Sequence, residues 1–548
     1  ESQERLTQGQ KELFESQERL TQGQKELFES QERLTQGQKE LFESQEKLTQ
    51  GQKELFEGQE KVTQGQKELF EGQEKLTQGQ DELFGGQKQL IEEQKEIKSE
   101  LRKLSKTVAK IEVEHGQKLE ILLDVVTGQI KKFDSEEIVP LHKIEDAYLM
   151  ELYHGPTSAF KDIALTLLPH LLIQSYNKEN RHDTISILTA TSGDTGKAAL
   201  SGFADVKHTA ITVFYPEVGV SQVQKKQMQT ATGDNVEVIA VKGNFDDCQR
   251  MVKEATQDPQ VLASLHNVTI SSANSINVGR LIPQVVYYYS SYCKLVKDGA
   301  IQCGDPVNFV VPTGNFGDIL AGYLAYRTGL QVNQLICASN SNNVLTDFLN
   351  TGTYSIHRPF IPTMSPSMDI LISSNLERLL FIMSDNDDSF VANMMKELNE
   401  QGSYTIPSNI QEKISSIFKG YWTSEEECAK TIHDLYKKEH VLIDPHTAVG
   451  LHAYRQYQLQ TQDKTPSIVL STASPYKFCK DVYQAVSSNC IEDDFEAMVA
   501  LHTYTQTAIP SNLACLKDLP VRFTRSIEKE DGMKVIAERM KEIGNDHN

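Results

Sequence analysis

The sequence predicts an α/β fold built on mostly parallel strands, preceded by a helical repeat. Residues 1–84 consist of six copies of one 14-residue unit, which sets them apart from the rest of the chain. From Ile138 onward, short β-branched runs alternate with helix-like segments, a pattern typical of a parallel sheet covered on both faces. Two glycine-rich turns each lie between a strand-like run and a helix-like run. In parallel sheets such turns are where ligands bind.

The repeat predicts a weak coiled coil. A coiled-coil heptad has two seam positions, a and d, that face the partner helix. In each copy one of them is aliphatic and the other is Gln, and each copy carries a glycine. That glycine costs about 1 kcal/mol relative to Ala in a helix. Both seam positions become aliphatic only from Leu101, so residues 87–112 are the best candidate for a coiled coil. Two interpretations stay open: a stalk that self-associates through residues 87–126, or a solvated repeat without a role. We predict a domain boundary that separates residues 1–128 from a catalytic region at 129–548.

The predicted elements of the catalytic region alternate along the chain. We expect strands at Thr184–Thr191, His208–Tyr215, Asn235–Val241, Val307–Val311, Gln334–Ser339 and Ser467–Thr472. We expect helices at Ile163–Tyr176, Lys197–Ala204, Gln222–Thr230, Asp246–Thr256, Ile276–Lys297 and Asp318–Thr328.

Charge and cysteine usage exclude several classes of function. The formal net charge of −21 argues against nucleic acid or an anionic membrane as the main partner. No apolar stretch approaches the roughly 18 residues of a spanning helix. The eight cysteines form no CxxC pair, which indicates reduced thiols in the cytoplasm and no metal site. The chain begins with Glu1, which is compatible with a fragment or a processed product.

Lys161 is the candidate reactive group. It ends the segment HGPTSAFK and precedes the apolar run Ile163–Ile173. Taken alone it would be an ordinary surface cation, and each glycine-rich turn (SGDTG at 192–196 and PTGNFG at 312–317) would be a plain tight turn. Together they suggest a reactive amine beside two anion-binding helix starts. Pyridoxal phosphate with an amino-acid substrate requires such a set.

Six motifs make the sequence resemble one known family. HGPTSAFKD, TATSGDTG, SANSINVGR, PTGNFGD, SPSMD and DPHTAVG occur in the order found in threonine synthases, which are pyridoxal-phosphate enzymes of fold type II. The resemblance covers about residues 138–525. It implies two subdomains with mostly parallel sheets and the cofactor in the cleft between them.

The resemblance also implies a role for each matching residue. Lys161 matches the lysine that forms the aldimine with the cofactor, and Thr472 matches the hydroxyl residue facing the pyridine nitrogen. The residues matching the loop that holds the cofactor phosphate are Gly314, Asn315, Phe316 and Asp318. Ser192 and Thr195 match the loop that receives the substrate carboxylate. The positions matching the site of the substrate's own phosphate are Asn274, Ser275 and Arg280.

The implied activity is conversion of O-phosphohomoserine and water to threonine and phosphate. Lys161, once displaced by the substrate, is the natural proton shuttle. Two alternatives stay open: a threonine-synthase-like phospholyase that releases 2-oxobutyrate, and a coiled-coil scaffold with a degenerate enzyme domain. We interpret Asp444-Pro445-His446 as a structural turn, because no second His or Cys stands at ligand spacing. We interpret Tyr287-Tyr288-Tyr289 as helix packing.

The chain departs from the family before the lysine motif. Threonine synthases carry a further folded segment there, and in this chain the repeat takes that place. Three explanations stay open: the chain is part of a longer protein, the segment is lost, or the segment lies upstream of the repeat.

Overall fold

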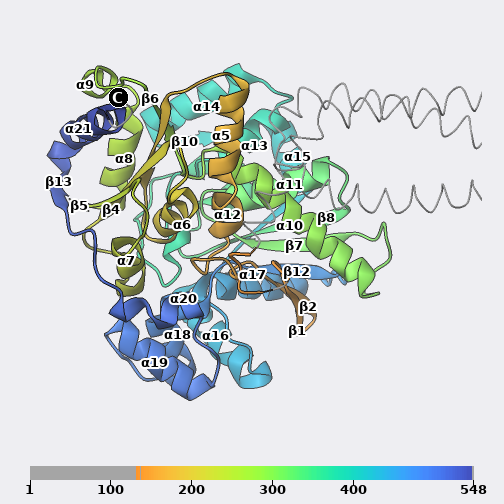
Figure 1. Cartoon of the computed structure of the whole chain (residues 1–548). Helices are drawn as coiled ribbons and strands as arrows, with labels where there is room; N and C mark the ends of the chain where they lie inside the picture. The colour runs from red at the N-terminus through yellow and green to blue at the C-terminus, as the bar shows by residue number, and fades with distance from the viewer. Residues whose placement is uncertain (1–130, 136, 546–548) are drawn as a thin grey trace, which may run out of the picture. The chain divides into compact units, whose positions relative to one another are not determined.

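The structure is a computed structural model that describes residues 131–135 and 137–545. The repeat, the coiled coil and the boundary at residue 128 lie outside the described residues and stay predictions. The described part contains two larger sheets and one small antiparallel pair of strands (Figure 1).

A six-stranded mixed sheet carries most of the core. Its strands, in spatial order, are β1 (Leu141–Ile144), β2 (Ala147–Glu151), β12 (Ser467–Ser471), β7 (Val307–Pro312), β8 (Val332–Ser339) and β11 (Phe418–Trp422). Only β1 runs antiparallel to its neighbour. Phe309 and Val311 of β7 belong to a core shared with α10 (Val278–Lys297), α11 (Gly317–Arg327) and α12 (Val344–Thr351), and Val310 belongs to a second core shared with α16 (Glu425–Glu439) and α17 (Pro445–Thr461). Burial on both faces explains why β7 is apolar at every position except Asn308.

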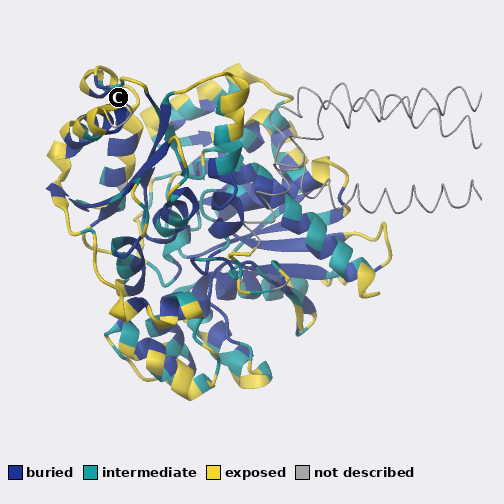
Figure 2. Ribbon diagram, viewed as in Figure 1, coloured by how far each residue is buried: buried dark blue, intermediate teal, exposed yellow. Residues whose placement is uncertain are grey.

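A second sheet of five parallel strands lies earlier in the sequence. Its order is β13 (Ser526–Glu528), β5 (Val236–Lys242), β4 (Thr209–Pro216), β3 (Thr184–Ala190) and β6 (Val268–Ser272). Helices α8 and α21 cover one face, and α6 and α7 cover the other. The central strands of both sheets are largely dark blue in Figure 2, the edge strands β1 and β13 carry exposed positions, and yellow positions gather on the outer sides of the helices. The smallest sheet pairs β9 (Thr353–Ser355) with β10 (Ser403–Thr405).

The helices connect these strands. They are α4 (Lys161–Leu165), α5 (Leu168–Lys178), α6 (Asp194–Phe203), α7 (Gln222–Gln229), α8 (Phe245–Ala255), α9 (Pro259–Leu262), α10 (Val278–Lys297), α11 (Gly317–Arg327), α12 (Val344–Thr351), α13 (Leu376–Met383), α14 (Asp388–Gln401), α15 (Ser408–Ser415), α16 (Glu425–Glu439), α17 (Pro445–Thr461), α18 (Cys479–Ser487), α19 (Asp494–Thr505), α20 (Ser511–Ala514) and α21 (Gly532–Asn545). None of the helices in this part of the chain is long and apolar enough to cross a membrane.

The predicted α/β class with mostly parallel strands is confirmed, and all six predicted strands are present within two residues of the expected ends. The single helix expected at Ile163–Tyr176 is wrong, because the structure has two helices, α4 and α5, separated at Thr166–Leu167. Pro169 stands in the first turn of α5, where its missing N–H removes no helical hydrogen bond. A proline deeper inside one long helix would have removed such a bond.

Candidate active site

Lys161 is fixed in place by the end of strand β12. The Phe160 N–H donates to the Thr472 carbonyl at 2.8 Å, and Ala159 forms an isolated antiparallel bridge with Ala473. Lys161 follows as the first residue of α4, with only 7% of its surface exposed. The structure therefore brings Lys161 and the backbone of Thr472 together, as the proposed roles of both residues require.

Two lysines share one buried carboxylate. Asp194 is the first residue of α6, directly after β3 and the turn at Gly193, whose φ is +144°. The Asp194 Oδ1 atom lies 2.7 Å from the Lys477 ammonium, and its Oδ2 atom lies 3.6 Å from Lys161 Nζ. The Gln224 side chain donates to the same carboxylate at 2.8 Å. Burial would raise the pKa of Asp194, but the charges of Lys477 and Lys161 outweigh that effect, so its pKa lies below the usual value.

Burial also makes Lys161 less basic. Loss of hydration lowers its pKa from 10.5 to about 8. Asp194 opposes this shift, whereas the nearby charges of Arg280 and Lys477 add to it. At pH 7 roughly a tenth of the Lys161 amine is therefore unprotonated and nucleophilic, far more than for a lysine at the usual pKa.

Arg280 is a buried cation that forms no ion pair with a carboxylate in the described part of the chain. It lies in the first turn of α10 with 4% of its surface exposed, and its Nη1 atom donates to the Ala273 carbonyl at 3.0 Å. Its buried Nε–H has no hydrogen-bond partner. Burial lowers the pKa of Arg280 to about 10. Among residues 131–135 and 137–545 no acidic side chain forms an ion pair with it, so the guanidinium remains available to an anionic ligand.

The other two residues predicted to hold the substrate phosphate are placed nearby but differ in availability. The Asn274 amide donates to the Ala190 carbonyl at 2.8 Å and accepts from the Ala190 N–H at 3.3 Å. It therefore ties the end of β6 to the end of β3. The Ser275 hydroxyl lies 3.2 Å from the Ser374 hydroxyl. Of the three, Arg280 has the clearest unused donor.

The loop between β7 and α11 is held by a neighbouring segment. A side chain at Gly314 would come within 2.7 Å of the Ser367 carbonyl, so the absence of a Cβ lets the two backbones meet. Phe316 adopts φ +59° as the residue before α11 and turns its buried ring against Phe418. Only the backbone of Phe316 can therefore face a ligand at this helix start.

Asp318 is oriented by tyrosines. The hydroxyls of Tyr287 and Tyr288 both donate to its Oδ1 atom, while its buried Oδ2 atom has no partner. Burial raises the pKa of Asp318 to about 6. The tyrosines therefore do more than pack their helix: they fix the first turn of α11 through this carboxylate. The backbone N–H groups of that turn have no intrahelical acceptor and are the groups that could bind an anion.

Comparison with known proteins supports one family for this arrangement. The family model described as "Pyridoxal-phosphate dependent enzyme" matches residues 128–473, and "Threonine synthase, C-terminal" matches residues 447–536. The threonine synthase of Pseudomonas aeruginosa is 40% identical over 360 residues, covering 64% of this chain and 73% of that protein. The chain belongs to the threonine synthase family of pyridoxal-phosphate-dependent enzymes.

Solved structures agree with this assignment. A crystal structure of yeast threonine synthase has a TM-score of 0.67 at 34% identity, covering 78% of this chain and 84% of that one. A pyridoxal-phosphate-bound threonine synthase from Brucella melitensis has a TM-score of 0.67 at 35% identity, covering 77% and 84%. Human "Threonine synthase-like 1" is 39% identical over 388 residues, covering 69% of this chain. The chain spans about half, 51%, of the length of that relative.

The residues of this threonine synthase family member fit the cofactor. Lys161 is a buried amine of lowered pKa beside the carboxyl end of β12. The first turn of α11 supplies backbone N–H groups for a phosphate, and Gly314 leaves room at the turn that precedes it. Lys161, the turn at Gly314–Phe316 and Thr472 are thus the residues that would hold pyridoxal phosphate.

Sequence reasoning missed four residues that the structure places around Lys161. They are Asp194, Ser367, His446 and Lys477. Asp194, Ser367 and His446 lie inside motifs that carry the family resemblance, and Lys477 follows Thr472 by five residues, so a signal was present. The interpretation of Asp444-Pro445-His446 as a structural turn is confirmed in part, because Asp444 caps α17. His446, however, also contacts the segment beside Lys161.

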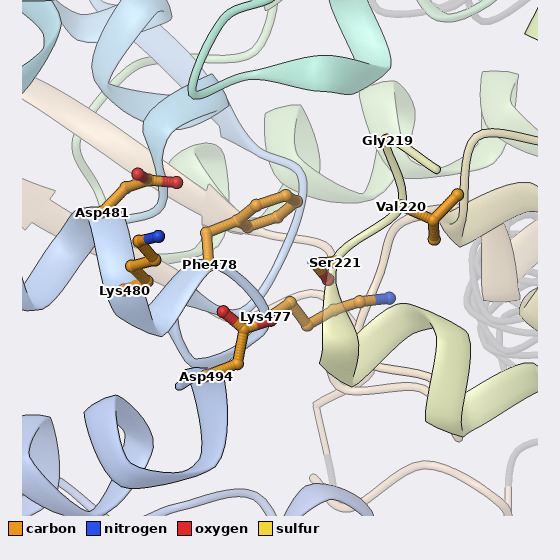
Figure 3. A pocket seen from close by; sticks show the side chains of 8 residues that line it. All are labelled: Gly219, Val220, Ser221, Lys477, Phe478, Lys480, Asp481 and Asp494. Carbon is orange, nitrogen blue, oxygen red and sulfur yellow. The ribbon is translucent and has the colours of Figure 1, made fainter. Parts of the chain in front are cut away.

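A hollow of about 310 Å³ lies beside Lys477 (Figure 3). Its lining residues are Gly219, Val220, Ser221, Lys477, Phe478, Lys480, Asp481 and Asp494. Lys161 is not among them, and the Lys477 ammonium itself bonds to Asp194. The hollow therefore adjoins the Lys161 site without containing the reactive amine.

The lowered pKa of Lys161 predicts a pH profile. The rate at which the apoprotein binds pyridoxal phosphate covalently is expected to be half-maximal near pH 8 and to level off above about pH 9, because the free amine is the nucleophile. Because the pKa of Lys161 is lower in the folded protein than in the unfolded chain, protonation of Lys161 lowers the free energy of unfolding below about pH 8. This destabilisation disappears as the pH rises from 8 towards 10.5. Stopped-flow absorbance measures the rate. A rate still rising steeply at pH 10 would contradict the shift.

Removing Lys477 is expected to raise the pKa of Lys161. In Lys477→Met, Asp194 interacts with Lys161 alone, and repulsion between the two lysines is lost. The covalent-binding profile should move to higher pH by about one unit, and the free energy of unfolding should fall by about 3–5 kcal/mol because a buried ion pair is broken. Urea unfolding measures the second effect. Lys480→Met is the control, because that lysine pairs with Glu492 at the surface.

Proposed function

We propose that this chain converts O-phosphohomoserine and water to threonine and inorganic phosphate. The observation that carries the proposal is Arg280, a buried guanidinium with an unused Nε–H and no acidic partner in the described part of the chain. Burying an unpaired guanidinium charge lowers the stability of the folded protein unless an anion binds to it. It lies close enough to Lys161 to lower the pKa of the amine, so the anion belongs to a molecule that reacts there.

A second anion position lies at the start of α6. The first-turn N–H groups of a helix have no intrahelical acceptor, and Asp194 and Thr195 are the first two residues of α6. The Thr191 hydroxyl already accepts from the Gly193 and Gly196 N–H groups, both at 2.9 Å. A substrate carboxylate would therefore bind to the N–H groups and hydroxyls of Ser192 and Thr195. A carboxylate here and a phosphate at Arg280 suit an amino acid whose side chain carries a phosphate ester.

The chemistry divides between the cofactor and the chain. When bound, pyridoxal phosphate withdraws electrons from the substrate α-carbon. The Lys161 amine, of pKa about 8, accepts a proton from the substrate and later returns one. Arg280 holds the ester phosphate as it leaves, because its charge matches the charge that develops on the leaving oxygens. Asp194 keeps Lys161 near the reacting carbons.

A product assay on the full chain tests the proposal. Protein loaded with pyridoxal phosphate is incubated with O-phosphohomoserine in ¹⁸O-labelled water, and phosphate, threonine and 2-oxobutyrate are quantified. We expect threonine equal to the phosphate released, with one ¹⁸O atom in its hydroxyl group. An excess of 2-oxobutyrate would establish the phospholyase alternative instead. Absence of both products, together with absence of covalent cofactor binding, would favour a scaffold.

Location and assembly belong to the same proposal. A cytoplasmic location is supported by dispersed cysteines without a CxxC pair. Self-association through residues 87–126 is supported by the aliphatic seam that begins near Leu101. Light scattering of the full chain at two concentrations would test the second point, and a monomer at both would exclude it.

A further inference from the structure

Ser367 lies between the two halves of the cofactor site. It is the middle residue of a 3-10 turn, η2 (Pro366–Met368), in the connection between β9 and α13. Its hydroxyl lies 3.4 Å from Lys161 Nζ and accepts a hydrogen bond from it. Its carbonyl faces the space where Gly314 lacks a side chain. One residue therefore contacts both the reactive amine and the turn that precedes α11.

His446 holds the backbone of Ser367. The Ser367 N–H donates to His446 Nε2 at 3.1 Å, so this nitrogen acts as an acceptor. The other ring nitrogen, Nδ1, lies 2.7 Å from Asp444 Oδ2 and donates to it. Asp444 is fully buried and caps α17 through the N–H groups of His446 and Thr447. The network therefore assigns the neutral tautomer with its proton on Nδ1.

The residues beside Ser367 are fixed as well. The Asn340 amide donates to Ser365 Oγ at 2.9 Å and to Asp369 Oδ1 at 2.8 Å. Asn340 is itself fully buried at the end of β8. The turn η2 is thus anchored from β8 on one side and from α17 on the other, and it presents the Ser367 hydroxyl at a defined position.

We propose that Ser367 is a catalytic residue that orients the Lys161 amine, and that His446 is a positioning residue acting through it. A lysine ammonium on a four-carbon stem needs more than one acceptor to fix its direction. Asp194 supplies one acceptor at 3.6 Å, but that carboxylate lies closer to Lys477. The Ser367 hydroxyl supplies the second, from a different segment of the chain. During turnover Lys161 gains and returns the proton, and Ser367 only accepts the hydrogen bond, so its own protonation does not change.

The first test uses the apoprotein and needs no substrate. Competitive acetylation of Lys161, followed by mass spectrometry over a range of pH, gives the pKa of its amine. Because an acceptor stabilises the ammonium form, Ser367→Ala is expected to lower this pKa by about one unit. Ser367→Thr, which keeps the hydroxyl, should stay close to the wild type. Ser384→Ala, at the exposed end of α13, is the matched control and should not shift it.

The second test separates positioning from general structure. His446→Gln keeps an acceptor for the Ser367 N–H, whereas His446→Leu does not. We expect His446→Leu to reproduce the pKa shift of Ser367→Ala, and His446→Gln to restore most of the wild-type value. A purely structural role would lower the melting temperature in both variants without moving the pKa of Lys161.

The consequence for turnover rests on the proposed function. In the holoenzyme, Ser367→Ala is expected to lower kcat by about tenfold with KM for O-phosphohomoserine nearly unchanged. An unshifted Lys161 pKa in Ser367→Ala would overturn the inference whatever the enzyme makes. A shifted pKa in a protein that produces no threonine would uphold the contact and would refute only the proposed function.

Discussion

Lys161→Ala is expected to abolish both covalent cofactor binding and threonine formation. Lys161 supplies the amine that binds the cofactor aldehyde and the group that moves the proton, and proton transfer alone is worth about 10²–10⁴ in rate. We therefore expect kcat to fall by at least about 10³-fold. Borohydride treatment followed by peptide mass mapping should find the cofactor on Lys161 in the wild type and nowhere on the variant.

The control for this experiment is Lys396→Ala. That lysine is exposed on α14, with 69% of its side chain accessible, and should leave trapping and turnover unchanged. Retained threonine formation in Lys161→Ala would refute the assignment of Lys161. Trapping on Lys477 in that variant would show instead that the neighbouring lysine can replace it.

Arg280→Met is expected to lose activity without losing stability. Removing the partner of a buried anion costs about 2–5 kcal/mol, so kcat/KM for O-phosphohomoserine should fall by about 10²–10³-fold. The pKa of Arg280 is lowered to about 10, so its charge costs stability in the empty site at neutral pH. The free energy of unfolding should therefore stay within about 1 kcal/mol of the wild type, or rise.

Two measurements check this pair of effects: steady-state kinetics and urea unfolding of the apoprotein. Arg250→Met is the matched control, because that arginine is 59% exposed and pairs with Asp247 on the surface of α8. Unchanged kcat/KM in Arg280→Met would place the substrate phosphate elsewhere. A loss of several kcal/mol in stability would show that Arg280 has a structural partner instead of a ligand.

Local sequence patterns predicted the strands well and one helix poorly. The buried run Val307–Pro312 contains three valines and a phenylalanine, and residues of these types favour a strand. The helix expected at Ile163–Tyr176 divides because α4 ends against α6. A side chain at Gly202 would come within 2.0 Å of the Leu165 carbonyl, so these two helices touch backbone to backbone. Such a contact between distant segments leaves no periodic signal.

In the candidate site, too, the motifs predicted which residues occur together, whereas the structure decided what each side chain contacts. Asn274 was assigned to the substrate phosphate by resemblance, and the structure uses its amide to join β6 to β3. Phe316 was assigned to the cofactor, and its ring lies in the core. A motif conveys which residue types occur together, but it does not tell which of them face the ligand and which hold the loop. Only packing decides that.

The sequence by itself determined the α/β class and the two glycine-rich turns and singled out Lys161 as the candidate reactive group, because these depend on local backbone chemistry and on short motifs. The tertiary structure alone decided how basic Lys161 is and what orients it. Asp194, Lys477 and Ser367 come from separate segments, and their distances to the amine or to one another depend on how α6, η2 and the 3-10 turn η3 (Pro475–Phe478) pack. Electrostatic effects at a buried amine depend on such distances and on burial, and neither is encoded in any one stretch of the chain.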